Sequence, residues 1–163
     1  MKVLGVDPGF GRCGVAVLEK ESGKESVLYS SCIETRATDL FPMRLSAVAL
    51  GCASLIKKYK PETLALERLF FNSNQKTAMQ VAEVRGAIIF VAASADLPVI
   101  EYTPGQVKVA VTGHGQADKE AVQRMLKSLL KIEKHIQHDD EYDAIAIALT
   151  HLACARRDSN KTL

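Results

Sequence analysis

The stretch Lys2-Val3-Leu4-Gly5-Val6-Asp7-Pro8-Gly9-Phe10-Gly11, followed by the apolar run from Cys13 to Glu19, decides the fold of this chain. Its first six residues are typical of a short strand that ends in an acid. Pro and Gly then predict a hairpin turn, because Pro fixes φ and Gly accepts a positive φ. So apolar a strand is expected in the middle of a sheet, with both faces covered. Asp7 would lie at its C-terminal end, where open α/β sheets hold ligands. Taken alone, an Asp before Pro and Gly is more often a turn residue than a ligand.

Composition is typical of one globular domain. With 163 residues the chain is large enough to bury a core, and 47% apolar and 25% charged residues exclude a disordered protein. We predict a domain over residues 1–157 and a disordered tail over 158–163. The net charge of +2 permits a polyanionic partner without requiring one.

Compartment is predicted from cysteine spacing and from the lack of targeting signals. The four cysteines are scattered and form no C-x-x-C pair, which favours reduced thiols over zinc ligands or disulfides. We find no signal segment and no apolar run of the ~20 residues that a membrane span needs. The expected protein is cytoplasmic and has no membrane partner.

The order of patterns predicts an α/β fold. A third strand over 27–34 extends the hairpin into an antiparallel meander, and apolar residues at intervals of three and four predict a helix over 41–59. That helix would act as a crossover, so that a strand over 63–67 lies parallel to the first. Further elements are expected as helices over 75–95, 104–112 and 119–131, a strand over 98–102, and a last helix entered through 138–143. The helix over 75–95 is apolar on more than one face, which favours a subunit contact.

Four acids are predicted to meet. Asp7 and Glu67 each end an apolar strand, and the two strands are expected to be neighbours. Asp140 and Asp143 share one face of the last helix's first turn, although Asp139 is also correctly spaced relative to Asp143. Helix capping explains one or two acids there, but four in one turn (139, 140, 141 and 143) would repel one another without a cation.

Oxygen ligands of this kind select Mg²⁺, or Mn²⁺ in its place, over zinc. Such a site suits phosphodiester hydrolysis, in which two ions ~4 Å apart activate a water and stabilise the leaving 3′-oxygen. No Ser, Cys or His stands in a pattern typical of a covalent nucleophile.

Basic and aromatic residues suggest a nucleic-acid surface. Residues 108–134 hold six Lys or Arg against three acids, and Arg124 and Lys127 lie on one outward helical face. That face suits phosphate contacts, although a solvated charged face is more common. The adjacent Phe70 and Phe71 are hard to bury together, so one of them is a candidate for stacking on a base.

The chain resembles the RuvC family of Holliday-junction resolvases, within the ribonuclease H-like superfamily. The resemblance spans nearly the whole chain, through Gly5-Val6-Asp7-Pro8-Gly9, Glu67-Arg68-Leu69-Phe70-Phe71-Asn72, Ala82-Glu83-Val84-Arg85-Gly86, Tyr102-Thr103-Pro104-Gly105-Gln106-Val107-Lys108, Asp140-Glu141-Tyr142-Asp143-Ala144-Ile145-Ala146 and Thr150-His151.

The resemblance implies a ribonuclease H-like fold with a five-stranded mixed sheet, three strands antiparallel and then two parallel, flanked by helices. It implies that Asp7, Glu67, Asp140 and Asp143 are metal ligands and catalytic residues, and that Lys108 and Lys119 contact DNA. It places Phe70 at the bases of the junction centre, although Phe71 is adjacent. It also implies a four-way DNA junction as substrate, a homodimer, and the branch-migration motor formed by RuvA and RuvB.

Three other functions are compatible with parts of the sequence. Another ribonuclease H-like nuclease would act on non-junction nucleic acid, and competition binding of a junction against a duplex would separate the two. An actin-like ATPase would also use an Asp and a Gly loop on a hairpin, but it needs a second similar domain. A non-catalytic junction scaffold would not need four acids.

Overall fold

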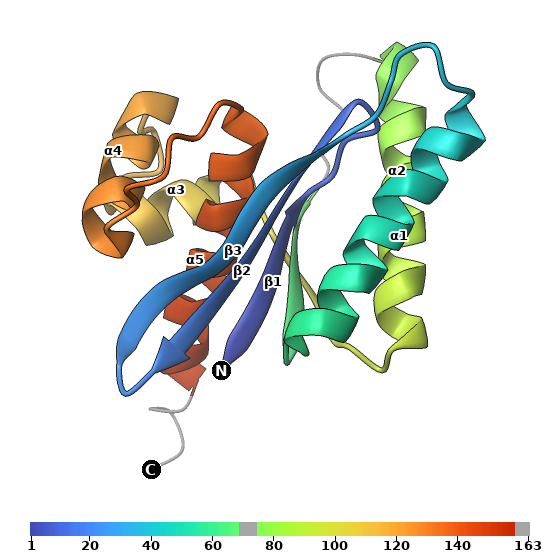
Figure 1. Ribbon diagram of the computed structural model, residues 1–163. Coiled ribbons are helices and arrows are strands. Elements are labelled where there is room, and N and C mark those ends of the chain that lie inside the picture. The colour runs from blue at the N-terminus through green and yellow to red at the C-terminus, as the bar shows by residue number, and fades with distance from the viewer. Residues whose placement is uncertain (69–74, 159–163) are drawn as a thin grey trace.

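The computed structural model describes residues 1–68 and 75–158. They form one five-stranded sheet with helices on both faces, as Figure 1 shows. The strands are β1 (Lys2–Asp7), β2 (Arg12–Glu21), β3 (Lys24–Glu34), β4 (Thr63–Glu67) and β5 (Val99–Tyr102). Their order across the sheet is β3-β2-β1-β4-β5.

The strand pairing confirms the predicted mixed sheet. β1 pairs antiparallel with β2, β2 pairs antiparallel with β3, and β1–β4 and β4–β5 are parallel. The polar residues 20–25 predict a longer turn between β2 and β3 than the structure has. Ser22 and Gly23 both have positive φ, at 50° and 81°, which is the geometry of a two-residue hairpin turn.

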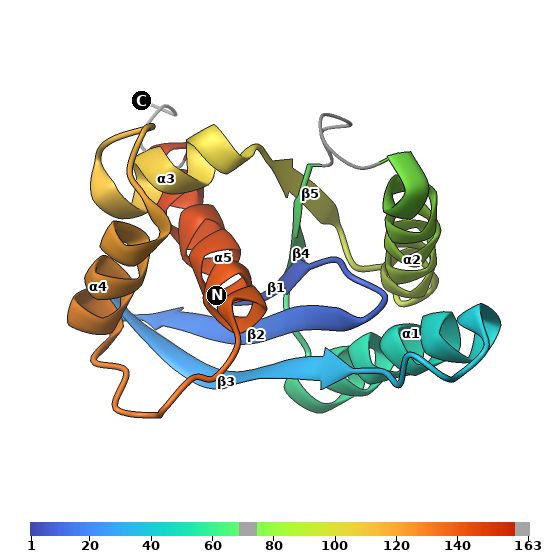
Figure 2. The same ribbon diagram turned by 90° about the horizontal axis from the view of Figure 1, so that it is seen from above.

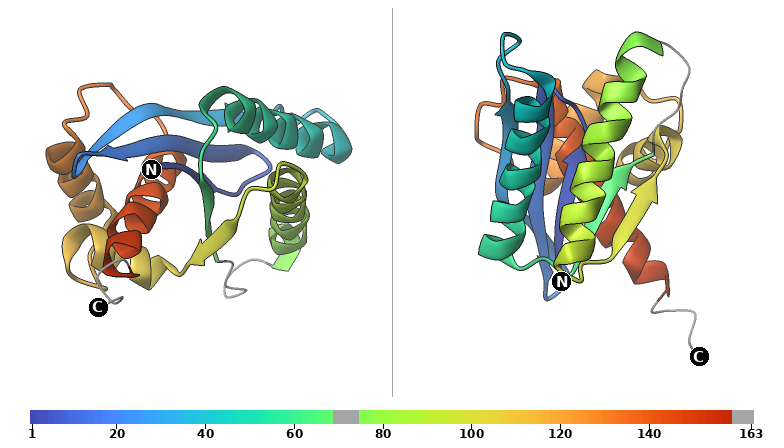
Figure 3. Two further views of the ribbon diagram at one scale, coloured as in Figure 1. Left: turned by 90° about the horizontal axis from the view of Figure 1, so that it is seen from below. Right: turned by 90° about the vertical axis from the view of Figure 1, so that its right-hand side faces the viewer.

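The helices form two layers. α1 (Phe41–Tyr59) and α2 (Gln75–Ser94) lie side by side on one face of the sheet, as the right panel of Figure 3 shows. α3 (Pro104–Thr112), α4 (Lys119–Leu130) and α5 (Asp139–Asp158) lie on the other face, with α5 against the strands (Figure 2). The predicted helix boundaries agree with these to within a residue or two.

The alternation of side chains along each strand determines which residues point to each face of the sheet. Leu4 and Val6 of β1 belong to the core under α1 and α2, whereas Val3 belongs to the core under α5. Because side chains alternate between faces, Gly5 and Asp7 share the face of Val3. The same parity places Glu67 with Ala65, and Arg12 with Ala16, on the side of α5. The site residues of three strands therefore point toward one helix.

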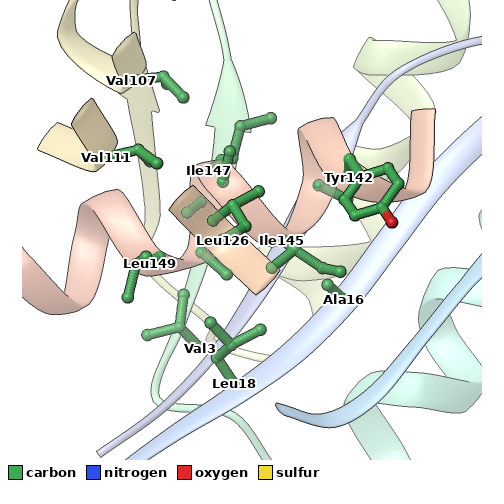
Figure 4. Close-up of a cluster of buried hydrophobic side chains, with 14 of the residues drawn as sticks. Val3, Ala16, Leu18, Val107, Val111, Leu126, Tyr142, Ile145, Ile147 and Leu149 are labelled. Carbon is green, nitrogen blue, oxygen red and sulfur yellow. The ribbon is translucent and has the colours of Figure 1, made fainter. Parts of the chain in front are cut away.

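The core on that side is made mainly by α5, whose residues 144–149 are all buried. Figure 4 shows Ile145 and Ile147 of α5 with Val3 and Leu18 from the strands and Leu126 from α4. The small side chains of this Ala-rich helix predict a close approach to the sheet. Gly5 is the matching feature of the strand, since a Cβ there would lie 2.3 Å from the Ala144 backbone oxygen.

The apolar spacing in α4 predicts that Val122, Met125, Leu126, Leu129 and Leu130 point inward, and two of these predictions are wrong. Met125 and Leu129 are 38% and 54% exposed. α4 packs on α3 and α5 through a narrow stripe, so only side chains on the centre line of the apolar face are covered. Val122 and Leu126 hold that centre line and are buried.

α2 departs from the expectation that no segment is long and apolar enough for a membrane. By length and composition alone, Thr77–Ser94 would suffice, with a mean hydropathy of 1.2 over 18 residues. One such helix is weak support for a span, since core helices of soluble proteins pass the same test. α2 packs its buried Val84, Ile88 and Ala92 into the core under α1 and the sheet.

Candidate active site

The predicted acids converge where β1, β4 and α5 meet. Val6 pairs with Leu66 in the parallel register, so Asp7 and Glu67 end neighbouring strands at the same edge of the sheet. Asp7 is also paired with Gly14 across β2. Gly14 lies under the first turn of α5, because a Cβ there would come within 1.8 Å of the Asp140 backbone oxygen. The strands thus bring the start of α5 directly over Asp7.

The pKa values of Asp7, Glu67 and Asp143 are all raised, as expected for carboxylates that are buried close together. Burial raises the pKa of Asp7 well above its ordinary range, and the charges of Glu67, Asp143 and Asp140 raise it further. Burial and then the charge of Asp143 raise the pKa of Glu67. Burial also raises the pKa of Asp143, and Lys119 opposes that rise. The carboxylates therefore repel one another in the metal-free protein and favour an added cation.

The first turn of α5 separates its acids by direction. Asp140 contributes to the raised pKa of Asp7. Asp139 instead accepts a hydrogen bond from Gln123 Nε2 of α4, at 3.1 Å. This geometry favours Asp140 over Asp139 as a partner of Asp7. Sequence spacing could not separate them, because both positions are within helical reach of Asp143.

Glu141, the remaining acid of this turn, belongs to a structural network. Its side chain is 7% exposed and accepts hydrogen bonds from Ser30 Oγ at 2.6 Å and from Lys134 Nζ at 2.8 Å. Lys134 also donates to the Ser30 backbone oxygen at 2.7 Å. The helical spacing of Arg124, Lys127, Lys131 and Lys134 predicts one outward basic face, and for Lys134 this is wrong. It lies beyond the end of α4 and ties the entry of α5 to β3.

Basic side chains balance the acids on two sides. Lys119 Nζ lies 3.7 Å from Asp143 Oδ2 and 3.8 Å from Asp139 Oδ2. Arg12 Nε lies 3.0 Å from Asp140 Oδ2. Lys108 and Lys119 line a small cavity of about 140 Å³ together with Glu67 and Asp143. The predicted basic pair thus lies beside the acids, whereas Arg12 was missed. The sequence signal that could have identified Arg12 was its spacing of two residues from Gly14, which places both residues on the same face of the strand.

The other predicted DNA contacts lie further out. Arg124 is 70% exposed and its Nη1 lies 3.8 Å from Glu120 Oε2 within α4. Lys127 Nζ lies 5.5 Å from the centre of the Tyr142 ring. Phe70 and Phe71 lie outside the described residues.

The donor set fits a hard divalent cation, since it offers carboxylate oxygens that are short of positive charge. Among the residues that the structure describes, however, no group of three or more His, Cys, Asp or Glu side chains is already arranged to hold a metal ion. Arg12 forms an ion pair with Asp140, and Lys119 forms one with Asp143. The roles of the four acids as metal ligands therefore remain a prediction.

Comparison with known proteins agrees with this arrangement. The profile of a family described as "Crossover junction endodeoxyribonuclease RuvC" matches residues 3–151. A relative of that name from Moorella thermoacetica is 44% identical over 155 residues, which is 95% of this chain and 93% of the relative. Another, from Petrotoga mobilis, is 44% identical over 151 residues, 93% of each chain. The structure of T. thermophilus RuvC in complex with Holliday junction substrate superposes with a TM-score of 0.90 at 32% identity, covering 98% of this chain and 97% of that one.

Proposed function

The chain belongs to the RuvC family of crossover junction endodeoxyribonucleases, and we propose that it resolves four-way DNA junctions through its carboxylate cluster. The observation that carries this proposal is the convergence of Asp7, Glu67 and Asp143: the charges of Glu67 and Asp143 add to the burial that raises the pKa of Asp7, and the charge of Asp143 adds to the burial that raises the pKa of Glu67. The reaction is hydrolysis of a phosphodiester bond in each of two matching strands of the junction. Paired cuts leave two nicked duplexes.

Divalent-metal dependence is part of the proposal, with Mg²⁺ as the ion and Mn²⁺ as a substitute. Asp7, Glu67, Asp140 and Asp143 would hold it, about two ions per site during cleavage. When bound, the metal supplies an activated water and stabilises the leaving 3′-oxygen. Asp7 anchors the set because its backbone is paired with Gly14 of β2, and the preceding residue, Val6, is paired with Leu66 of β4.

The basic residues of this chain position the substrate strand. Lys108 and Lys119 line the cavity beside Glu67 and Asp143, so their ammonium groups meet a phosphate that enters there. Lys119 then exchanges its contact with Asp143 for one with DNA. An aromatic from Phe70 or Phe71 stacks on a junction base, worth ~1–3 kcal/mol per stacked base.

A cleavage assay tests the function. A synthetic four-way junction should be cut at symmetric positions in the presence of Mg²⁺ and left intact in EDTA. Linear duplex added in molar excess should compete poorly with the junction for the protein. Cleavage of the duplex at a similar rate would instead favour a ribonuclease H-like nuclease that acts on non-junction nucleic acid.

A homodimer formed through α2 places one site on each of two matching strands, because a junction has near two-fold symmetry. α2 exposes Met79 and Phe90, 72% and 71% accessible, one above the other at a spacing of eleven residues. Gly86 lies between them, and nothing lies within 4 Å of a Cβ built there. This stripe suits close contact with a second copy of α2.

Phe90→Glu is expected to weaken the dimer by about 10- to 100-fold, because it inserts a charge into an apolar contact. Analytical ultracentrifugation across a dilution series measures the change. Junctions should then be nicked in one strand more often than cut in both. Leu50→Glu on α1, also exposed at 66%, is the matched control. If Phe90→Glu leaves the dimer intact, α2 is not the interface.

The basic face of α4 is proposed to contact phosphates away from the cut. Arg124→Glu together with Lys127→Glu should weaken junction binding several-fold and reduce the slope of log K against log salt by about one to two. A fluorescence-anisotropy titration at several salt concentrations measures this. Lys57→Glu with Lys58→Glu, at the end of α1, is the control pair. An unchanged slope would identify the α4 face as merely solvated.

The family further suggests a cytoplasmic protein that works with the branch-migration motor of RuvA and RuvB. We propose both on that ground. Pull-down with purified motor proteins on a junction tests the second.

A further inference from the structure

Arg12 is a charged residue beside the acids, within the described part of the chain, that neither the sequence pattern nor the proposed mechanism uses. It opens β2, and its Nε lies 3.0 Å from Asp140 Oδ2. The Arg12 side chain is 55% exposed and that of Asp140 is 26% exposed. The guanidinium therefore reaches in from solvent to a carboxylate that faces the site.

This contact competes with a metal ion for the same oxygen. Asp140 is the candidate ligand in the first turn of α5 whose charge acts on Asp7. A carboxylate oxygen paired with a guanidinium is less available to a second cation, and the positive charge of Arg12 repels a divalent ion nearby.

The same guanidinium suits a phosphate. Arg presents a planar fork that binds phosphate with two hydrogen bonds, and its long side chain allows it to swing between partners. Arg12 lies at the edge where β1 ends, beside Gly14 and the first turn of α5. A DNA strand bound over Asp7 would lie beside this edge, because Gly14, two residues after Arg12, pairs with Asp7.

We propose that Arg12 is an exchangeable counter-cation, which neutralises Asp140 in the free protein and moves to a DNA phosphate when the substrate binds. Asp140 is then released to the metal, so DNA binding and metal binding strengthen each other. By linkage the coupling is reciprocal. This inference rests on the proposed metal site and assigns Arg12 a positioning role, since it acts through Asp140.

Mn²⁺ binding to the free protein provides the first test. Arg12→Gln should bind Mn²⁺ about three- to tenfold more tightly than the parent, because a competing charge is gone. Electron paramagnetic resonance of free Mn²⁺ measures this without any cleavage. Arg36→Gln is the matched control. It removes the same charge from an exposed residue that makes no ion pair within the described part of the chain. Unchanged or weaker Mn²⁺ binding by Arg12→Gln overturns the proposal.

Junction binding in EDTA provides the second test. Arg12→Gln should bind a four-way junction several-fold more weakly, with a salt slope smaller by about one, and Arg12→Lys should fall between it and the parent. Junction binding equal to the parent overturns the transfer to phosphate. If the parent itself neither binds Mn²⁺ nor cuts junctions, the proposed function fails. If the parent does both and Arg12→Gln changes neither affinity, only the role of Arg12 fails.

Discussion

Asp7→Asn should abolish junction cleavage while junction binding stays intact or becomes tighter. Asp7 is the acid on which the other three act most strongly, and the amide keeps its shape while removing the charge that holds a cation. We expect the cleavage rate to fall by about a thousandfold or more, the scale on which loss of one central electrostatic group acts. Binding should not suffer, because one negative charge fewer faces the DNA backbone. Single-turnover cleavage and anisotropy on the same junction measure both quantities.

Asp96→Asn is the matched control. Asp96 is exposed in the turn after α2 with a φ of 53°, which Asn tolerates, so this variant should cut and bind like the parent. If Asp7→Asn cuts junctions at near the parental rate with Mg²⁺, the carboxylate cluster is not the metal site. If it loses binding as well as cleavage, Asp7 supports the fold rather than the chemistry.

The same variant should also be more stable than the parent at neutral pH without metal. The folded-state pKa of Asp7 is raised by burial and by its neighbours, so the folded protein favours the protonated acid. Stability is therefore full below the unfolded pKa and is lost as pH rises toward the folded one. Asn does not titrate and escapes this loss. Each kcal/mol recovered raises Tm by roughly 2–4 °C in a chain of this size. Thermal melts in EDTA from pH 4 to pH 8 should show the Tm of Asp7→Asn rising further above that of the parent as pH increases. A constant difference in Tm would contradict the raised pKa of Asp7.

Sequence patterning was sufficient for the sheet because each strand carries its own signal. β1 and β4 are both short apolar runs that end in an acid, and the amphipathic run between them predicts the crossover that makes them parallel. The boundary of α1 was predicted to the residue, since a 3.6-residue period ends at Lys60 before Pro61. These local signals agree with the final fold, so little remained for tertiary contacts to override.

What patterning missed depends on partners distant in the chain. Glu141 looks like its acidic neighbours in sequence, but it is buried because Lys134 and Ser30 meet it from the preceding loop and from β3. Met125 and Leu129 fit the apolar period of α4, yet they stay largely exposed in the part of the chain that the structure describes. Arg12 looks like an ordinary strand end until Asp140 is placed beside it. Sequence spacing predicts which face of a helix or strand a residue occupies. It does not predict which side chain of another helix or strand will contact that residue.

Gly14→Ala should disable the site without touching any acid. The added Cβ would lie 1.8 Å from the backbone oxygen of Asp140 and 2.5 Å from its carbonyl carbon. Both atoms belong to the main chain of α5, so no side chain can rotate aside and the first turn must move off the sheet. We expect a loss of about 1–3 kcal/mol in the free energy of unfolding. Cleavage should fall about a hundredfold, because a shift of ~1 Å in a catalytic group has that effect. Urea unfolding and single-turnover cleavage measure the two losses.

Gly105→Ala separates this effect from the general cost of replacing a glycine. Gly105 opens α3, and the nearest atom to a Cβ there is Thr103 Oγ1 at 3.9 Å, an ordinary contact, so the control should remain stable and active. Junction binding in EDTA then locates the defect. If Gly14→Ala binds the junction like the parent but cuts it slowly, the acids of the site are wrongly spaced. Junction binding is then retained because it requires only that the protein is folded. Parental stability and cleavage in Gly14→Ala would show that α5 does not seat on Gly14, and the convergence of Asp140 with Asp7 would have to be abandoned.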